Sequence, residues 1–171
     1  MNSKVILINI LRWIVLLVVQ IFLLRNIGFY NLSTPFIYIL FILVLPFHIP
    51  NLVLYTLAFT TGLTIDAFYD TLGVHTSACV ALSFVRISFI SISLNREGID
   101  EPEPSLGNMG FRWFALYALL CIFTHHVVVF FLEAFKLSEF SYTLSRSLLS
   151  TAFSLFLILL TEFIFHNRKS S

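Results

Sequence analysis

The chain has 171 residues, of which 58% are hydrophobic and 11% are charged, and its mean hydropathy is +0.95. Because soluble domains carry about 25% charged residues, this composition excludes an ordinary soluble protein and indicates an integral membrane protein. Ten basic and nine acidic residues leave a formal net charge of +1, which provides no basic field that would attract nucleic acid.

The first apolar run extends from Leu7 to Leu24 and is not followed by a small-residue cleavage site. We therefore expect a retained membrane helix rather than a secretory signal peptide. In the second apolar stretch, Pro46 and Pro50 each remove a backbone donor and restrict the residue before them, which predicts two short helices separated at these prolines. Three longer runs follow, and a polar loop at 95–108 separates the first of them from the other two.

A helix needs about 20 predominantly apolar residues to cross the hydrocarbon core of a membrane. On this basis the sequence predicts an all-α polytopic membrane protein, with about six transmembrane helices in a single domain over residues 1–171. The predicted spans are 7–24, 36–46, 52–65, 74–94, 111–135 and 142–165.

The distribution of lysine and arginine predicts the orientation of the chain, because short cytoplasmic loops keep a positive excess. Six spans would place both termini on one side of the membrane. That side carries Lys4, Arg12, Arg96, Arg112, Arg168 and Lys169, whereas the other side carries Arg25 and Lys136. We therefore expect both termini in the cytoplasm. If the pair of short helices is instead re-entrant, the parity of the crossings changes, and the segment after it changes side.

Two glycines and two aspartates, Gly62, Asp66, Asp70 and Gly73, lie at the junction between the third and fourth predicted spans. A carboxylate close to hydrocarbon costs a few kcal/mol on insertion scales, so it persists where it faces protein, water or a cation. Gly62 permits a close helix approach and Gly73 permits a turn, so one interpretation is a tight hairpin with its acids in water. In the other interpretation, Asp66 binds backbone donors or an arginine and shapes a surface where another protein docks.

Charged residues inside the apolar runs suggest two ion pairs. At a rise of about 1.5 Å per residue, Arg12 in the first span and Glu162 in the last lie at similar depths, so they would neutralise each other if their helices touch. Glu133 and Arg146 form a second candidate pair across the short connection between the last two spans. The alternative is that the arginines, Arg86 included, extend their guanidinium groups to a nearby interface.

His125 and His126 lie together in the fifth span, and His126 shares a helical face with Glu133, an arrangement that allows a proton relay or a metal site. Adjacent histidines point about 100° apart on a helix, and the chain has no H-E-x-x-H motif, which favours two packed histidines instead. Cys79 and Cys121 lie in separate apolar runs without metal-ligand spacing. Because the sequence also contains no G-x-S-x-G motif and no P-loop, we expect no catalytic activity, metal or cofactor.

The order of these features resembles the MreD family of rod shape-determining proteins, in its Bacteroidota form. The resemblance covers essentially residues 1–169. It rests on the runs Gly62-Leu63-Thr64-Ile65-Asp66 and Leu72-Gly73-Val74-His75, the Ile49-Pro50 break, Trp113-Phe114, and the stretch from His125-His126 to Phe130-Phe131-Leu132-Glu133-Ala134-Phe135. It implies a six-helix inner-membrane protein without enzymatic activity, similar in fold to the membrane substrate-binding subunits of energy-coupling-factor vitamin transporters.

The resemblance also implies a role in the cell. Such a protein would be a scaffold of the cell-elongation machinery that organises peptidoglycan synthesis and cell shape by binding the bitopic protein MreC. Its indirect partners would be the actin-like MreB and the RodA glycosyltransferase with its transpeptidase, and it would contact membrane lipid and associate with copies of itself. The alternative function is a membrane subunit that binds a small, vitamin-like solute, which requires an outward cavity near residues 66–75 lined by several polar groups.

Overall fold

The computed structural model describes residues 3–25, 27, 33–94, 103–135 and 140–169. Its helices are α1 (Ser3–Val18), the π-helix η1 (Val19–Leu24), α2 (Ile39–Leu43), α3 (Asn51–Tyr69), α4 (Val74–Ser93), α5 (Leu106–Met109), α6 (Phe111–Ala134) and α7 (Phe140–Lys169). In the described part of the chain, five helical stretches are long and apolar enough to cross a membrane, namely α1 with η1, α3, α4, α6 and α7. The prediction of an all-α polytopic membrane protein is confirmed.

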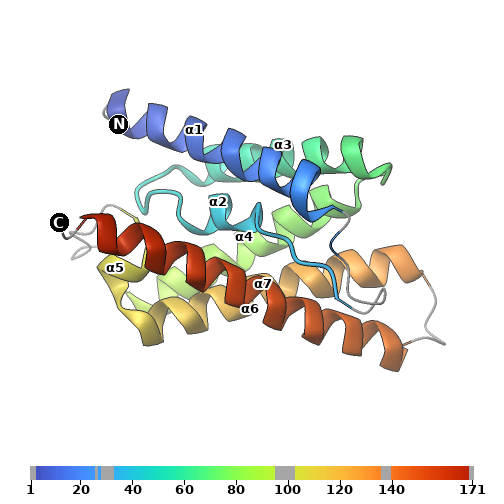
Figure 1. Cartoon of the computed structure of the whole chain (residues 1–171). Helices are drawn as coiled ribbons and strands as arrows, with labels where there is room; N and C mark the ends of the chain where they lie inside the picture. The colour runs from blue at the N-terminus through green and yellow to red at the C-terminus, as the bar shows by residue number, and fades with distance from the viewer. Residues whose placement is uncertain (1–2, 26, 28–32, 95–102, 136–139, 170–171) are drawn as a thin grey trace.

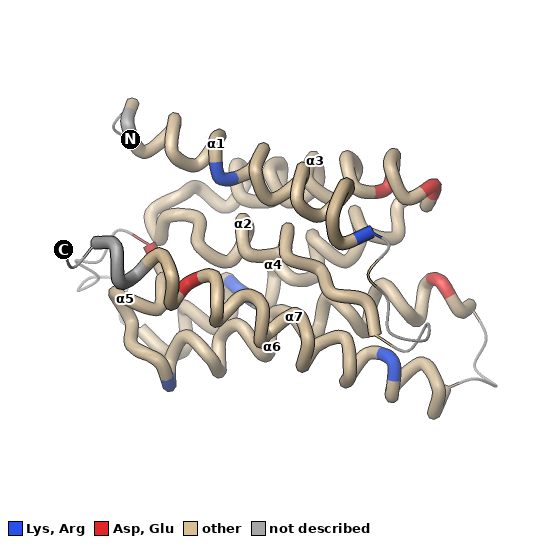
Figure 2. The backbone as a smooth tube through the Cα atoms, in the orientation of Figure 1, with Lys and Arg blue, Asp and Glu red and all other residues tan. Residues whose placement is uncertain are grey.

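These long helices lie lengthwise beside one another in a bundle (Figure 1). We call the end of the bundle where α1 begins and α7 ends the terminal end, and the other end the opposite end. The charged residues of the described chain gather toward these two ends, so the middle of the bundle is almost entirely uncharged (Figure 2). This distribution is typical of a bundle whose long axis crosses the hydrocarbon core.

The predicted transmembrane helix at 36–46 is wrong, because α2 has only 5 residues and is flanked by turns and irregular backbone. The chain nevertheless runs from the opposite end back to the terminal end in this region (Figure 1). We call residues 33–46 the central segment. It supplies a sixth pass through the bundle, and α1 therefore begins at the same end at which α7 ends.

The central segment is enclosed by protein. All ten residues from Phe36 to Leu45 have exposed fractions of 9% or less, and α2 contacts α1, α3, α4 and α6. Irregular backbone at membrane depth is tolerated only where protein or a water-filled cavity surrounds it, because lipid offers no hydrogen bonds. The surrounding helices therefore make the interrupted pass physically acceptable.

The helix predicted at 52–65 is longer in the structure, because α3 runs over 19 residues from Asn51 to Tyr69. Pro50 lies just before its first residue, where proline costs no intrahelical hydrogen bond. A Cβ atom added to Gly62 would lie 2.5 Å from the Thr76 Cα atom, so this glycine allows α3 and α4 to approach closely. Gly73, with a φ of 78°, provides the left-handed turn that begins α4.

Candidate functional site

The candidate functional site is the central segment together with the polar side chains that bind its backbone. A backbone amide or carbonyl group that is left unsatisfied in hydrocarbon costs several kcal/mol. The irregular parts of the central segment cannot pair their backbone groups within a helix, so they need partners from elsewhere. Side chains of α1, η1, α4, α6 and α7 provide these partners.

Gln20 binds the backbone on both sides of Phe36. Its Oε1 atom accepts a hydrogen bond from the Ile37 amide at 2.8 Å, and its Nε2 atom donates to the Pro35 carbonyl at 3.2 Å. The same Nε2 atom donates to the Tyr69 hydroxyl at 2.8 Å, and the Gln20 side chain is fully buried. Gln20 lies in η1, and such π-helical turns change the direction in which a side chain points, often at functional sites.

Two serines of α7 bind the same part of the central segment from the other side. The Ser150 hydroxyl accepts a hydrogen bond from the Thr34 amide at 2.9 Å, and the Ser154 hydroxyl accepts one from the Phe36 amide at 2.9 Å. Both serines are fully buried. They are four residues apart, so they lie on one face of α7 and follow the extended backbone of the segment.

At the terminal end, the carbonyl groups of Leu43, the last residue of α2, and of the residues after it receive donors from three helices. The Tyr117 hydroxyl donates to the Leu43 carbonyl at 2.8 Å. Arg86 donates from Nη2 to the carbonyls of Leu45 and Pro46, and Arg12 donates to the Val44 carbonyl at 3.5 Å. Arg86 is 2% exposed. Its guanidinium group therefore lies inside the protein and does not extend to the membrane interface, which was the alternative prediction. The last carbonyl groups of a helix have no intrahelical donors, and here side chains of other helices supply the missing hydrogen bonds.

The two adjacent histidines of α6 have different surroundings. His126 Nδ1 lies 2.8 Å from the Ile122 carbonyl, so this nitrogen carries the hydrogen. Its Nε2 atom then accepts a hydrogen bond from the Ser154 hydroxyl at 3.2 Å, while that hydroxyl accepts from the Phe36 amide. His126 is therefore linked through Ser154 to the central segment, which agrees with a packed histidine.

His125 belongs to a second buried group, which is centred on the Tyr38 hydroxyl. This hydroxyl lies 2.6 Å from His125 Nε2 and 2.9 Å from His75 Nδ1. It donates to one ring and accepts from the other, because a hydroxyl has a single hydrogen. His125 Nδ1 and His75 Nε2 have no hydrogen-bond partner among the described residues.

Asp66 connects the end of α3 to the start of α4. Its carboxylate accepts hydrogen bonds from the His75 amide at 2.9 Å and from the Thr76 amide at 2.9 Å. The hydroxyl groups of Thr71 and Thr76 also donate to it. Asp66, which is 3% exposed, therefore caps the first turn of α4 from the neighbouring helix α3. The side chain of Asp70, in contrast, is 89% exposed, and its carboxylate lies 3.6 Å from the guanidinium group of Arg25. The structure separates these two aspartates into a buried cap and a surface charge.

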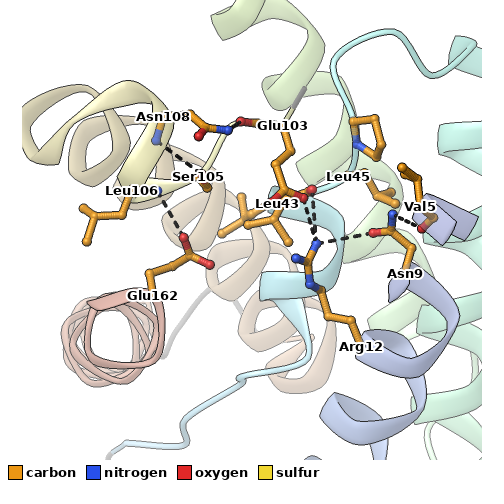
Figure 3. A network of polar contacts seen from close by, with 12 residues as sticks. Val5, Asn9, Arg12, Leu43, Leu45, Glu103, Ser105, Leu106, Asn108 and Glu162 are labelled. Carbon is orange, nitrogen blue, oxygen red and sulfur yellow. Dashed lines mark hydrogen bonds and ion pairs between the residues drawn. The ribbon is translucent and has the colours of Figure 1, made fainter. Parts of the chain in front are cut away.

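The predicted pair of Arg12 and Glu162 is wrong. Arg12 Nη1 lies 3.2 Å from the carboxylate of Glu103, and Glu162 accepts a hydrogen bond from the Leu106 amide at 3.1 Å (Figure 3). Both contacts are at the terminal end, so the predicted similarity in depth holds. Glu103 begins the described part of the polar loop, which lies between α1 and α7 and continues into the short helix α5.

The second predicted pair is present in the structure. Arg146 Nη1 lies 3.0 Å from the carboxylate of Glu133, and its guanidinium carbon lies 4.1 Å from the ring centroid of Phe130. This pair joins α6 to α7 at the opposite end of the bundle, and the aromatic ring adds a cation–π contact.

The polar side chains of the site bind backbone groups and one another. Within the described residues, no group of three or more histidine, cysteine, aspartate or glutamate side chains is placed to hold a metal ion. Sequence reasoning missed Gln20, Tyr117, Ser150 and Ser154, and the available signal was their polar character within apolar runs. These hydrogen bonds hold the central segment in place.

Comparison of the chain with protein-family models, with curated proteins and with solved structures gives no match.

Proposed function

We propose that the chain is a non-enzymatic scaffold of the cell-elongation machinery in the inner membrane, which organises peptidoglycan synthesis and cell shape by binding MreC. The partners and the process come from the resemblance to the MreD family. The observation that supports a scaffold most strongly is the filled centre of the bundle. There, each residue from Phe36 to Leu45 has an exposed fraction of 9% or less.

A filled centre favours a scaffold over a solute-binding subunit. A small-molecule site is a concavity of about 300–1,000 Å³ with a few polar groups that converge on the ligand. In this bundle, the polar side chains at the centre converge instead on the protein's own backbone, as Gln20, Ser150 and Ser154 do. A solute would have to displace the central segment and leave these groups without partners.

The junction between α3 and α4 is the proposed docking surface for MreC. Leu72 is fully exposed at the tip of this hairpin, and Phe68 is 46% exposed beside it. Asp66 fixes the hairpin from below, so an apolar tip is presented on a rigid base. Pre-organised apolar groups bind a partner with a smaller loss of conformational entropy.

Within the membrane, the α1–η1 stretch provides a second contact surface. It is the least buried of the five long stretches, and its exposed side chains are large and apolar, with Leu7 at 67% and Leu11 at 61%. A bitopic partner has a single transmembrane helix, which packs against such a helix by van der Waals contact. The same surface serves self-association. By the positive-inside rule, both termini lie in the cytoplasm and the junction between α3 and α4 faces outward.

Crosslinking followed by pull-down from membranes tests the proposal. We compare the wild-type protein with Leu72→Ser at matched expression, because Leu72 makes no contribution to the core. The matched control is Leu52→Ser, which removes a leucine exposed at 79% at the start of α3, at the terminal end. Recovery of MreC with the wild type and with Leu52→Ser, and its loss with Leu72→Ser, supports the scaffold and its docking surface.

Two other outcomes have clear meanings. If the wild-type protein is abundant and folded but brings down neither MreC nor cell-wall synthases, the elongation scaffold is wrong. If MreC is recovered equally with all three proteins, the scaffold stands and the junction is not its docking surface.

A further inference from the structure

A cavity of about 370 Å³ lies at the terminal end, between the turn that precedes α3 and the second half of α4. Much of its wall is apolar and includes Phe47, Ile87 and Ile90. Three polar residues, His48 of the turn, Asn51 of α3 and Arg86 of α4, also line it. Apart from Arg86, the side chains that bind the central segment do not line this space, so it requires a separate explanation.

Arg86 supplies a positive charge to the cavity. Its side chain is 2% exposed, and its Nε atom has no hydrogen-bond partner among the described residues. The Nη2 atom donates to two carbonyl oxygens, which are neutral acceptors. Three arginines form ion pairs with carboxylates of described residues, namely Arg12, Arg25 and Arg146. Arg86 forms none with any carboxylate of the described residues. A buried guanidinium group without an anion is costly.

The start of α3 borders the same cavity. Pro50 and Asn51 line the space, and Pro50, the N-cap residue of this helix of 19 residues, makes no capping side-chain hydrogen bond. The first backbone N–H groups of a helix lack intrahelical acceptors, and the aligned peptide dipoles place a partial positive charge there. An uncapped helix start and a buried arginine therefore converge on one space, and both attract an anion.

We propose that this cavity binds one phosphate group, carried either by the headgroup of an anionic phospholipid or by free phosphate. A phosphate offers acceptor oxygens to the guanidinium group and to the helix N-terminus at the same time. The apolar wall formed by Phe47, Ile87 and Ile90 suits the first carbon atoms of an acyl chain. This inference does not depend on the proposed function, because phosphate binding in this cavity requires neither MreC nor the docking surface at the junction between α3 and α4.

The test uses the purified full-length chain in detergent. Native mass spectrometry measures the binding of phosphatidylglycerol, with zwitterionic phosphatidylcholine as the reference lipid. A parallel thermal-unfolding series measures the effect of inorganic phosphate against chloride at equal ionic strength. We expect one phosphatidylglycerol molecule to bind more tightly than phosphatidylcholine.

Two variants change the cavity without removing the bonds between Arg86 and the central segment. Asn51→Asp places a carboxylate at the helix start, where it repels an anion, and Ile87→Trp fills part of the space. We expect each to weaken phosphatidylglycerol binding by about fivefold or more. The controls are Ser141→Asp, the same change of charge in the first turn of α7 at the opposite end, and Ile92→Trp, at a side chain that is 86% exposed.

The outcomes separate the two sources of phosphate. Selective phosphatidylglycerol binding that Asn51→Asp and Ile87→Trp weaken, and that both controls keep, supports a lipid site. Stabilisation by inorganic phosphate with the same dependence on the variants, but without lipid selectivity, supports a site for free phosphate. The inference is overturned if neither phosphate source binds, or if Ser141→Asp reduces binding as much as Asn51→Asp does.

Discussion

Gln20 and Ile37 are joined by a hydrogen bond of 2.8 Å from the Ile37 amide to the side-chain oxygen of Gln20. The amide nitrogen of the same side chain binds the Pro35 carbonyl, so one glutamine replaces both partners that a neighbouring strand or helix turn would provide. This contact keeps an irregular backbone inside a membrane bundle. The position of the central segment therefore depends on single polar side chains such as Gln20.

Gln20→Leu tests this dependence, because leucine has a similar volume but no hydrogen-bonding groups. The Ile37 amide and the Pro35 carbonyl would be left buried without their present partner, and each such group costs about 1–3 kcal/mol. We therefore expect a loss of about 2–5 kcal/mol in the free energy of unfolding. The measurement is reversible unfolding in mixed micelles. Thr60→Val is the control, because the Thr60 hydroxyl is exposed and binds only carbonyls of its own helix, and it should change stability little. Equal stability of Gln20→Leu and the wild type would contradict the role assigned to Gln20.

Gly62→Ala tests the close approach of α3 and α4. The added methyl group would meet the Thr76 Cα atom at 2.5 Å, and this contact is with backbone, which cannot move aside as a flexible side chain does. We expect a loss of about 1–3 kcal/mol and a lower melting temperature. Gly73→Ala is the comparison, because a Cβ atom there meets nothing within 4 Å and its cost comes only from the positive φ of 78°. That cost is about 1–2 kcal/mol. A melting temperature of Gly62→Ala equal to that of the wild type would contradict the close approach, because it would show that α3 and α4 are farther apart.

Asp66→Asn tests the cap that Asp66 provides for α4. The carboxylate accepts from two backbone amides and two hydroxyl groups, whereas the asparagine side chain offers one acceptor oxygen and turns a donor toward these same groups. We expect a loss of about 2–3 kcal/mol. Asp70→Asn is the matched control, since that carboxylate is 89% exposed and its ion pair with Arg25 at 3.6 Å contributes at most about 1 kcal/mol. Thermal unfolding of both variants in the same detergent gives the comparison, and similar losses would refute the distinction between the two aspartates.

The long helices could be predicted from the sequence because their signal is local. A run such as Phe111–Ala134 is predominantly apolar, and no interaction with another segment is needed to recognise it. The pair of Glu133 and Arg146 could be predicted for a similar reason, since a short connection brings the two residues together. Hydropathy and short-range spacing are sufficient in both cases.

The central segment could not be predicted, because its conformation depends on partners that are distant in the sequence. The Phe36 amide is bound by Ser154, which is 118 residues away, and the Leu43 carbonyl is bound by Tyr117, which is 74 residues away. An isolated serine or tyrosine in an apolar run does not indicate which backbone group it binds. For the same reason an apolar run between prolines looked like a helix.

The contact between Arg12 and Glu103 provides the clearest test of the corrected pairing, and it joins residues 91 positions apart. In a double-mutant cycle with Arg12→Gln and Glu103→Gln, we expect a coupling energy of about 0.5–1.5 kcal/mol, because the side chains are only partly exposed, at 24% and 15%. Exchange of the charges, with Arg12→Glu and Glu103→Arg combined, should recover part of the stability that each single reversal loses. The combination of Arg12→Glu with Glu162→Arg should recover none, since the Glu162 carboxylate binds the Leu106 amide instead of Arg12. Denaturant unfolding of the five single variants, the three double variants and the wild type measures these differences. Recovery with Glu162→Arg, but not with Glu103→Arg, would restore the pairing that the sequence alone suggested and would refute the position of Glu103 beside α1.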